Sequence, residues 1–120
     1  MREVKIGSRE FTKVTSNACM EFNTYHNYYI SPINKDPDEI DGLFGNVKFQ
    51  VGPIKENGVN GCHHEDLVAI VLDRLQCFQA SEYKCRENAL AITKLEEALH
   101  WLRHRTDARS ARGVEGTSEV

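Results

Sequence analysis

The chain has 120 residues and a formal net charge of −3 at pH 7, which fits one ordinary domain rather than two independent cores. It has no apolar run near the roughly 18 residues of a membrane helix, and its N-terminus does not resemble a signal peptide. The composition therefore predicts a soluble intracellular protein. The acidic balance argues against a protein that coats nucleic acid by bulk charge.

The first half, residues 1–60, is expected to form about four short antiparallel strands, because apolar and polar residues alternate there in short runs. The strands are expected at residues 4–6, 10–14, 20–30 and 46–51. Gly7-Ser8 suits a two-residue type II′ turn, and residues 34–45 read as an acidic loop. The turn-forming residues 57–61 mark the end of this half.

The second half, residues 61–120, is expected to form two antiparallel helices joined by a short connector. The first helix is expected to have a wide apolar stripe, made of Leu67, Val71, Leu75 and Phe78 and joined by Val68, Ile70 and Leu72. The stripe of the second helix is read as Ile92, Leu95, Leu99 and Leu102. The second helix should run from Cys85 to Arg112, stopped by Gly113. The predicted fold class is thus α+β, a small N-terminal antiparallel sheet followed by a long helical hairpin, in one continuous domain.

The expected second helix is long for a domain of this size. It would measure about 42 Å at 1.5 Å per residue, whereas a compact chain of this length is about 35 Å across. Either the end of the helix projects, or a second copy of the chain covers it.

Four cysteines, Cys19, Cys62, Cys77 and Cys85, form no C-x-x-C pair, which weakens zinc-ribbon and thioredoxin interpretations. In a cytosol they are expected to be reduced and packed as small apolar groups, with two disulfides as the alternative. Cys62-His63-His64 favours a turn and helix cap over a metal site, because adjacent side chains do not converge as zinc ligands do. His100 and His104 lack an evident third ligand, and no catalytic set can be assembled from residue order alone.

The end of the second helix is a basic island in this acidic chain. Residues 101–113 contain four arginines and one aspartate. Arg105, Arg109 and Arg112 recur at spacings of four and three, so their guanidinium groups share one helical face. This pattern suits an anionic partner such as phosphate, and it equally suits a solvated helix end whose cations favour the helix dipole.

Polar residues continue the apolar stripe of the second helix at both ends, with Asn88 before it and Thr106 and Arg109 after it. A polar group in a half-buried position needs a partner, which a ligand can supply. The simpler alternative is that the stripe ends in solvent. Phe78, beside the connector, is open to two interpretations: a base-stacking aromatic, or a residue that caps the core of the hairpin, which is the default.

Several spaced segments resemble a known family, the phage anti-defence nucleotide sponges that share a helical hairpin, namely the type-one branch of Thoeris anti-defence proteins and the related anti-CBASS sponges. The resemblance covers about residues 46–117. It rests on Asn60-Gly61, Glu65-Asp66-Leu67, Asp73-Arg74-Leu75, Phe78-Gln79, residues 85–90, residues 95–99, Arg105-Thr106, Arg109 and residues 112–117. The strand-rich first half resembles the Thoeris branch more than the all-helical CBASS branch.

The resemblance implies binding without turnover, with no catalytic residue, metal or cofactor, in the cytoplasm of an infected bacterium. It implies a homo-oligomer, often a hexamer, that encloses cyclic ADP-ribose variants between subunits, and in some members cyclic di- or trinucleotides in separate pockets. The residues that match ligand-binding positions are Phe78 for the base, Asn88 near the ligand, Arg105 and Thr106 for phosphates, and Arg109, Glu115, Gly116 and Thr117 as further pocket members. No membrane contact and no stable nucleic-acid complex are expected.

The chain departs from the family pattern at two places near these positions. Ser118 stands where a histidine is common, and the connector reads Ser81-Glu82-Tyr83-Lys84 in place of Gly-Pro-aromatic. Two other functions stay open: a nucleic-acid-binding module that uses the face of Arg105, Arg109 and Arg112, and a phosphodiesterase-type enzyme that acts on cyclic nucleotides.

Overall fold

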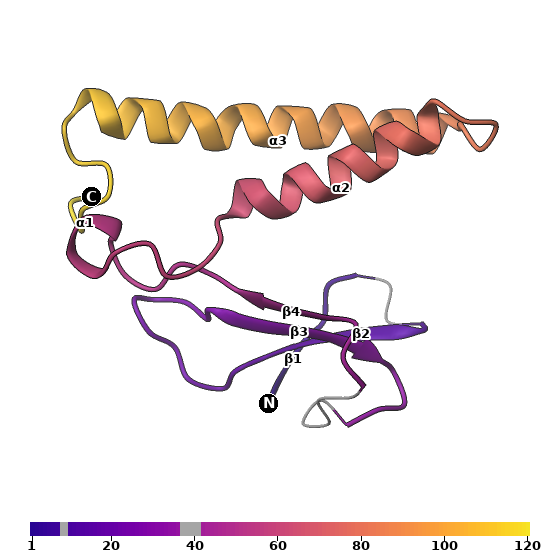
Figure 1. The fold of residues 1–120 in the computed structure, drawn as a ribbon, viewed down its shortest axis with the longest axis horizontal. Coiled ribbons are helices and arrows are strands. Elements are labelled where there is room, and N and C mark those ends of the chain that lie inside the picture. Colours follow the sequence, from indigo (N-terminus) through magenta and orange to yellow (C-terminus); the bar gives the residue numbers. More distant parts are fainter. Residues whose placement is uncertain (8–9, 37–41) are drawn as a thin grey trace. The chain divides into compact units, whose positions relative to one another are not determined.

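The computed structural model describes residues 1–7, 10–36 and 42–120, which form two compact units, Met1–Cys62 and His63–Val120 (Figure 1). The strands and helices are, in chain order, β1 Arg2–Val4, β2 Thr12–Ser16, β3 Asn27–Pro32, β4 Gly45–Lys48, α1 Ile54–Asn57, α2 His64–Gln79 and α3 Arg86–Ala111. Strands followed by helices confirm the α+β class. Neither long helix is apolar enough to cross a membrane, and no such helix occurs elsewhere in the described ranges.

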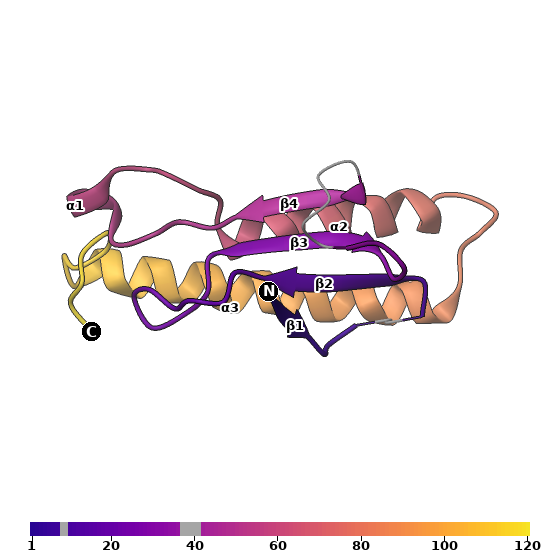
Figure 2. The same ribbon diagram turned by 90° about the horizontal axis from the view of Figure 1, so that it is seen from below.

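The first unit is a four-stranded antiparallel sheet in the order β1-β2-β3-β4, as the sequence predicts (Figure 2). Val14 of β2 lies opposite Val4 on one side and Ile30 on the other, so branched apolar side chains meet across three strands. Tyr28 adds an edge-on ring contact with Phe49, with 5.6 Å between the ring centroids.

The strand borders differ from the prediction in three places. β1 ends at Val4 and β2 begins at Thr12, where strands were expected at residues 4–6 and 10–14. The turn expected at Gly7-Ser8 falls partly outside the described residues. β4 ends at Lys48 rather than Val51, because the backbone beyond it bonds to the segment before α2. Part of the expected acidic loop, residues 37–41, lies outside the described residues.

The third difference is a tight turn before β3, which begins only at Asn27. Glu21 and Thr24 exchange both backbone hydrogen bonds, at 2.9 and 3.1 Å. Between them Phe22 and Asn23 have φ of 46° and 72°. Asparagine tolerates this left-handed region and phenylalanine rarely adopts it, so an aromatic run that reads as strand conceals a turn.

Side chains replace the strand ladder after β4. The Asn60 side chain accepts a hydrogen bond from Val51 N–H at 2.8 Å and donates to the Val51 carbonyl at 2.9 Å. Gln50 accepts from Asn60 N–H at 3.0 Å and donates to the carbonyl of Gly58 at 2.7 Å. These bonds close the segment that contains the unpredicted short helix α1, and they hold the chain where it enters α2.

We expect Asn60→Ala to destabilise the first unit by about 1–3 kcal/mol, because it leaves both backbone groups of Val51 without their partner. Urea unfolding followed by circular dichroism measures the loss. Asn57→Ala is the control, since the Asn57 side chain makes a single exposed hydrogen bond, to the Pro53 carbonyl at 3.2 Å. An equal loss in both variants would contradict this explanation.

The second unit is the antiparallel pair α2 and α3 (Figures 1 and 2). At the start of α2, Asp66 Oδ2 accepts from the backbone N–H of His63 at 2.8 Å, which confirms the capping interpretation of Cys62-His63-His64. Cys85 Sγ accepts from Asn88 N–H at 3.4 Å and caps α3. Gly113, with φ of 75°, ends α3 as predicted.

Half-buried residues on the two helices follow a coiled-coil spacing. On α2 they include Val68, Leu72 and Leu75, and on α3 they include Ile92, Leu95 and Leu99. The predicted stripe of α2 is therefore partly wrong, because Val71 and Phe78 are 48% and 37% exposed. One α-helix cannot turn so wide an apolar surface toward a single neighbour, so α2 keeps a second apolar face.

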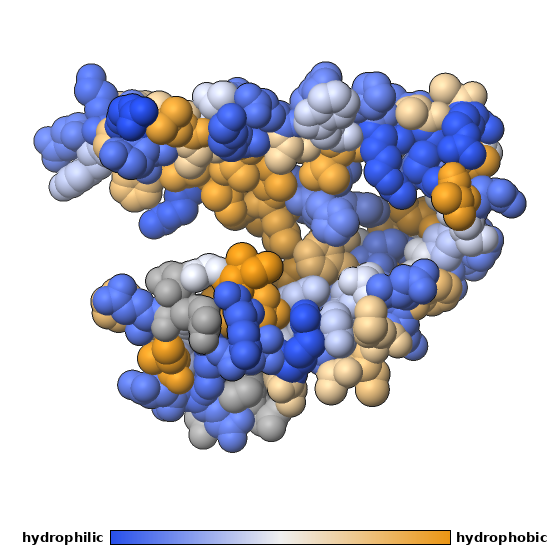
Figure 3. All heavy atoms as spheres, turned by 180° about the vertical axis from the view of Figure 1, so that it is seen from behind, coloured by the Kyte–Doolittle hydropathy of each residue, from blue (hydrophilic) through white to orange (hydrophobic). Residues whose placement is uncertain are grey.

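Polar residues, rather than large apolar ones, are the buried side chains among the described residues. Thr15, Ser16, His26 and Ser31 are buried, whereas no hydrophobic residue in the described ranges is. Figure 3 shows apolar side chains reaching the surface along the helical hairpin. All four cysteines are free, and only Cys62 is half-buried, so the expectation that they pack as small apolar groups is wrong for Cys19, Cys77 and Cys85.

Candidate functional site

The basic end of α3 extends beyond its partner helix. α3 has 26 residues and α2 has 16, or about 39 and 24 Å at 1.5 Å per residue. Since the helices are antiparallel and joined by a short connector, the last turns of α3 have no α2 residue opposite them. The arginines that the sequence singles out lie on these turns.

The half-buried stripe of α3 continues into polar residues at both ends, as the sequence predicts. Its members, at spacings of four and three, are Asn88, Ile92, Leu95, Leu99, Leu102, Thr106 and Arg109. The Thr106 hydroxyl donates to the Leu102 carbonyl at 3.3 Å, so its oxygen keeps the capacity to accept a further bond.

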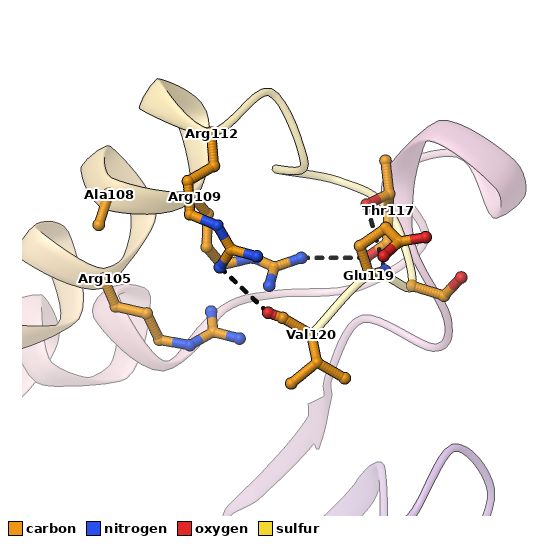
Figure 4. Close-up of a pocket in the computed structure, with 8 residues that line it drawn as sticks. Arg105, Ala108, Arg109, Arg112, Thr117, Glu119 and Val120 are labelled. Atoms are coloured by element: carbon orange, nitrogen blue, oxygen red, sulfur yellow. Dashed lines mark hydrogen bonds between the residues drawn. The ribbon is translucent and has the colours of Figure 1, made fainter.

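The first pocket, of about 550 Å³, lies where α3 meets the tail that follows it. Arg105, Arg109 and Arg112 project into it from one face of the helix, and Thr117 and Ser118 line it from the tail (Figure 4). The expected convergence of three guanidinium groups on one face is therefore present.

The three arginines have different environments. Arg109 is 13% exposed, donates from Nη2 to the carbonyls of Val114 at 3.0 Å and Thr117 at 3.2 Å, and pairs through Nε with Glu115 Oε2 at 3.3 Å. Arg112 donates to the Val120 carbonyl at 3.1 Å. Arg105 is exposed and has no hydrogen-bond or ion-pair partner among the described residues. Arg105 is thus the pocket cation that is open to an anion.

The second pocket, also of about 550 Å³, surrounds Phe78 at the far end of the hairpin. Ile70, Arg74 and Cys77 line it from α2, and Tyr83 lines it from the connector. The Arg74 guanidinium carbon lies 5.2 Å from the centroid of the Phe78 ring. Phe78 is therefore a partly exposed pocket residue, which favours a ligand contact over its default interpretation as a core cap.

Arg74 is a pocket residue that the sequence analysis missed as a candidate. The sequence does contain a feature that could have identified Arg74. It lies four residues before Phe78, and this spacing places an arginine beside an aromatic ring on one helical face. Tyr83 is 69% exposed, so this aromatic too belongs to the surface.

The two pockets lie at opposite ends of one hairpin. Phe78 is near the end of α2, next to the start of α3, where Asn88 lies. Arg105 lies about 26 Å beyond Asn88 along α3 at 1.5 Å per residue. One chain therefore brings together Arg105, Arg109 and Thr117, and it separates Phe78 from all three. Asn88, Thr106, Glu115 and Gly116 line neither pocket.

Groups of three or more histidine, cysteine, aspartate or glutamate side chains that could hold a metal ion are not found in the described part of the chain. His100 and His104 instead flank Trp101, at ring centroid distances of 5.3 and 5.6 Å from the indole.

Two comparisons place the chain among known proteins. Residues 45–107 match the family model "Acb2/Tad1, hairpin domain", a match that begins at β4 and ends near the last turn of α3. The chain is also 46% identical, over 83% of each protein, to "Thoeris anti-defense 1" of Bacillus phage SBSphiJ7.

The family match contains Phe78, Asn88, Arg105 and Thr106, whereas Arg109 and residues 115–117 lie beyond it. The resemblance expected over residues 46–117 is thus covered by the family model as far as residue 107, and the similarity to the phage protein extends over most of the chain. On both comparisons, this chain belongs to the Acb2/Tad1 hairpin-domain family.

Proposed function

We propose that this protein is a phage anti-defence sponge, which binds and sequesters the nucleotide signals of bacterial immunity without cleaving them. The ligands are cyclic ADP-ribose variants, together with cyclic di- or trinucleotides, and the place of action is the cytoplasm of the infected bacterium. The membership of the hairpin family and the similarity to a Thoeris anti-defence protein support this proposal.

The observation that carries the proposal further is the separation of the two pockets. An aromatic ring suits a nucleobase and an unpaired guanidinium suits a phosphate. Phe78, however, lies near the start of α3, and Arg105 lies about 26 Å beyond Asn88 along that helix. A cyclic nucleotide is much shorter than this distance. We therefore propose that the site forms between two copies, with Phe78 and Asn88 from one and Arg105 and Thr106 from the other.

The surface of the hairpin supports association with further copies. No residue of α2 or α3 is buried, and α2 keeps the exposed apolar residues Ile70 and Val71, at 65% and 48%. Covering this apolar area would stabilise an oligomer by about 25 cal/mol per Å². A homo-oligomer, a hexamer by family resemblance, also explains how a long helix in so short a chain is covered.

The energies agree with a site that is built from several preorganised contacts. Stacking of a base on Phe78 contributes about 1–3 kcal/mol. A hydrogen bond between a phosphate and Arg105 contributes about 1.5–3 kcal/mol. Nanomolar binding needs about −12 kcal/mol, so contacts from two chains that are held rigidly by the oligomer are required.

A release experiment distinguishes a sponge from an enzyme. The protein is incubated with cyclic ADP-ribose, the free ligand is removed, and the complex is heat-denatured before chromatography of the supernatant. A sponge returns the intact nucleotide, whereas a phosphodiesterase-type enzyme returns a product. Recovery of product in proportion to enzyme and time would overturn the proposal.

A subunit-mixing experiment tests whether the site lies between copies. Phe78→Ala and Arg105→Ala proteins are each expected to bind poorly, because each damages every composite site. When the two are unfolded and refolded together, oligomers that contain both variants regain intact sites, with Phe78 from one chain and Arg105 from the other. Calorimetry should then show a fraction of sites with wild-type affinity. A mixture that stays as weak as its parts would contradict the composite site.

The nucleic-acid alternative predicts binding to ordinary DNA or RNA that weakens steeply with salt. The engagement of Arg109 and Arg112 by the tail counts against it, because it leaves Arg105 as the open cation of the three. Titration with a random-sequence duplex and a single strand at two salt concentrations decides between the two functions.

A further inference from the structure

We infer that Arg109 is a positioning residue, which clasps tail residues 114–117 so that the end of the tail, from Thr117 to Val120, lines the pocket opposite Arg105. Its partner in this clasp is Glu115, which does not line the pocket, whereas Arg109 lines the pocket with its guanidinium bound to the tail. The consequence for binding rests on the proposed function, whereas the clasp itself stands on contacts within the chain.

The turn that ends α3 prepares the clasp. Gly113 adopts φ of 75°, its N–H donates to the Ser110 carbonyl at 3.0 Å, and Val114 N–H donates to the Arg109 carbonyl at 3.1 Å. This pair of bonds is the Schellman arrangement, which turns the chain back along the helix. Val114 is thereby fixed next to the side chain of Arg109.

The guanidinium of Arg109 then holds the returning tail at three points. Nη2 donates to the carbonyls of Val114 and Thr117, and Nε lies 3.3 Å from Glu115 Oε2. The Thr117 hydroxyl, in turn, donates to the Val114 carbonyl. A planar fork with several donors can bridge such acceptors, which the point charge of a lysine cannot do equally well.

Burial distinguishes this arginine from its neighbours. The Arg109 side chain is 13% exposed, whereas Arg105 and Arg112 are exposed. Glu115 Oε2 is itself buried, and Arg109 is the cation that faces it. Because a buried carboxylate oxygen needs a compensating charge, removal of Arg109 leaves Glu115 Oε2 without the cation that faces it. The positive charge of Arg109 is therefore largely compensated by Glu115 and by the tail carbonyls of the same chain.

This arrangement predicts that Glu115→Gln weakens the binding of an anionic nucleotide, although the change removes a negative charge near the pocket. If Glu115 were only a negative charge near an anion site, Glu115→Gln would strengthen binding of an anionic nucleotide. If Glu115 holds Arg109 and the tail in place, the same change loosens the wall that carries Thr117 and weakens binding. We expect a loss of about tenfold in affinity for cyclic ADP-ribose.

The clasp is tested first without ligand, by hydrogen exchange of the backbone amides of Val114 and Thr117, which bond to Arg109 and Val114. We expect Glu115→Gln and Arg109→Ala each to speed this exchange by about tenfold, and Glu115→Asp to restore part of the protection. Arg105→Ala is the matched control and should leave the exchange unchanged. Unchanged exchange in both clasp variants would overturn the inference.

Calorimetry with cyclic ADP-ribose is the second measurement. Gly113→Ala disturbs the same tail without a change of charge, because an alanine is strained at this φ, and it should weaken binding by about fivefold. Tighter binding by Glu115→Gln would overturn the positioning role. If the wild-type protein binds none of the cyclic nucleotides, the proposed function fails, and the exchange measurement still decides whether the clasp exists.

Discussion

Phe78→Ala is expected to lower the affinity for cyclic ADP-ribose by about 5- to 150-fold while α2 and α3 remain folded. The loss follows from base stacking, which an alanine cannot supply. The fold should survive because the Phe78 ring is 37% exposed and lines an open pocket, so its removal leaves little cavity inside the hairpin. Calorimetry gives the affinity, and circular dichroism with thermal unfolding gives the helix content and stability.

The control for this variant is Phe44→Ala, which removes a ring that is 70% exposed in the other unit. It should leave the affinity unchanged. If Phe78→Ala loses its helix content instead of its ligand, the ring is part of the core, and the stacking role is wrong. Phe78→Tyr would be less informative, because the tyrosine ring still presents a stacking face.

Arg105→Ala is expected to weaken the same ligand by about 10- to 100-fold without dissociation of the oligomer. Arg105 is the cation of the first pocket that has no partner among the described residues, so its substitution breaks nothing within the chain. A phosphate that loses it loses a charge-assisted hydrogen bond. Calorimetry measures the affinity, and light scattering measures the oligomer mass.

Arg103→Ala serves as the control, because Arg103 is exposed on α3 and does not line the pocket. It carries the same charge two residues away. Equal losses for Arg103→Ala and Arg105→Ala would mean a diffuse electrostatic effect and would favour the nucleic-acid alternative. Unchanged affinity in Arg105→Ala would contradict the phosphate site.

Local signals in the sequence were sufficient for the two long helices, α2 and α3. Glu65 and Asp66 at the start of α2 and Gly113 after α3 act through bonds within a few residues, so the predicted borders lie close to the observed ones. The strands were harder, since their borders depend on partners that are distant in sequence. Asn60 and Gln50 end the pairing after β4 through side-chain bonds that no periodicity reveals.

The choice between faces of a helix also lay beyond the sequence. Leu67, Val71, Leu75 and Phe78 satisfy a helical spacing as well as Val68, Leu72 and Leu75 do. Only the packing of α3 against α2 shows that the second set is half-buried and that Val71 and Phe78 are exposed. Residue order alone therefore could not decide whether Phe78 is a core residue or a ligand contact, because this depends on how α2 packs against α3.

The sequence by itself determined the α+β class, the helical hairpin, the shared face of the three arginines and the family, because helix periodicity, capping and spaced motifs are local properties of the chain. The tertiary structure alone decided that Arg109 is held by the tail while Arg105 is open, and that Phe78 and Arg105 lie at opposite ends of one hairpin. The physical reason is that burial, ion pairing and separation in space depend on how the chain turns back on itself, which residue order does not specify.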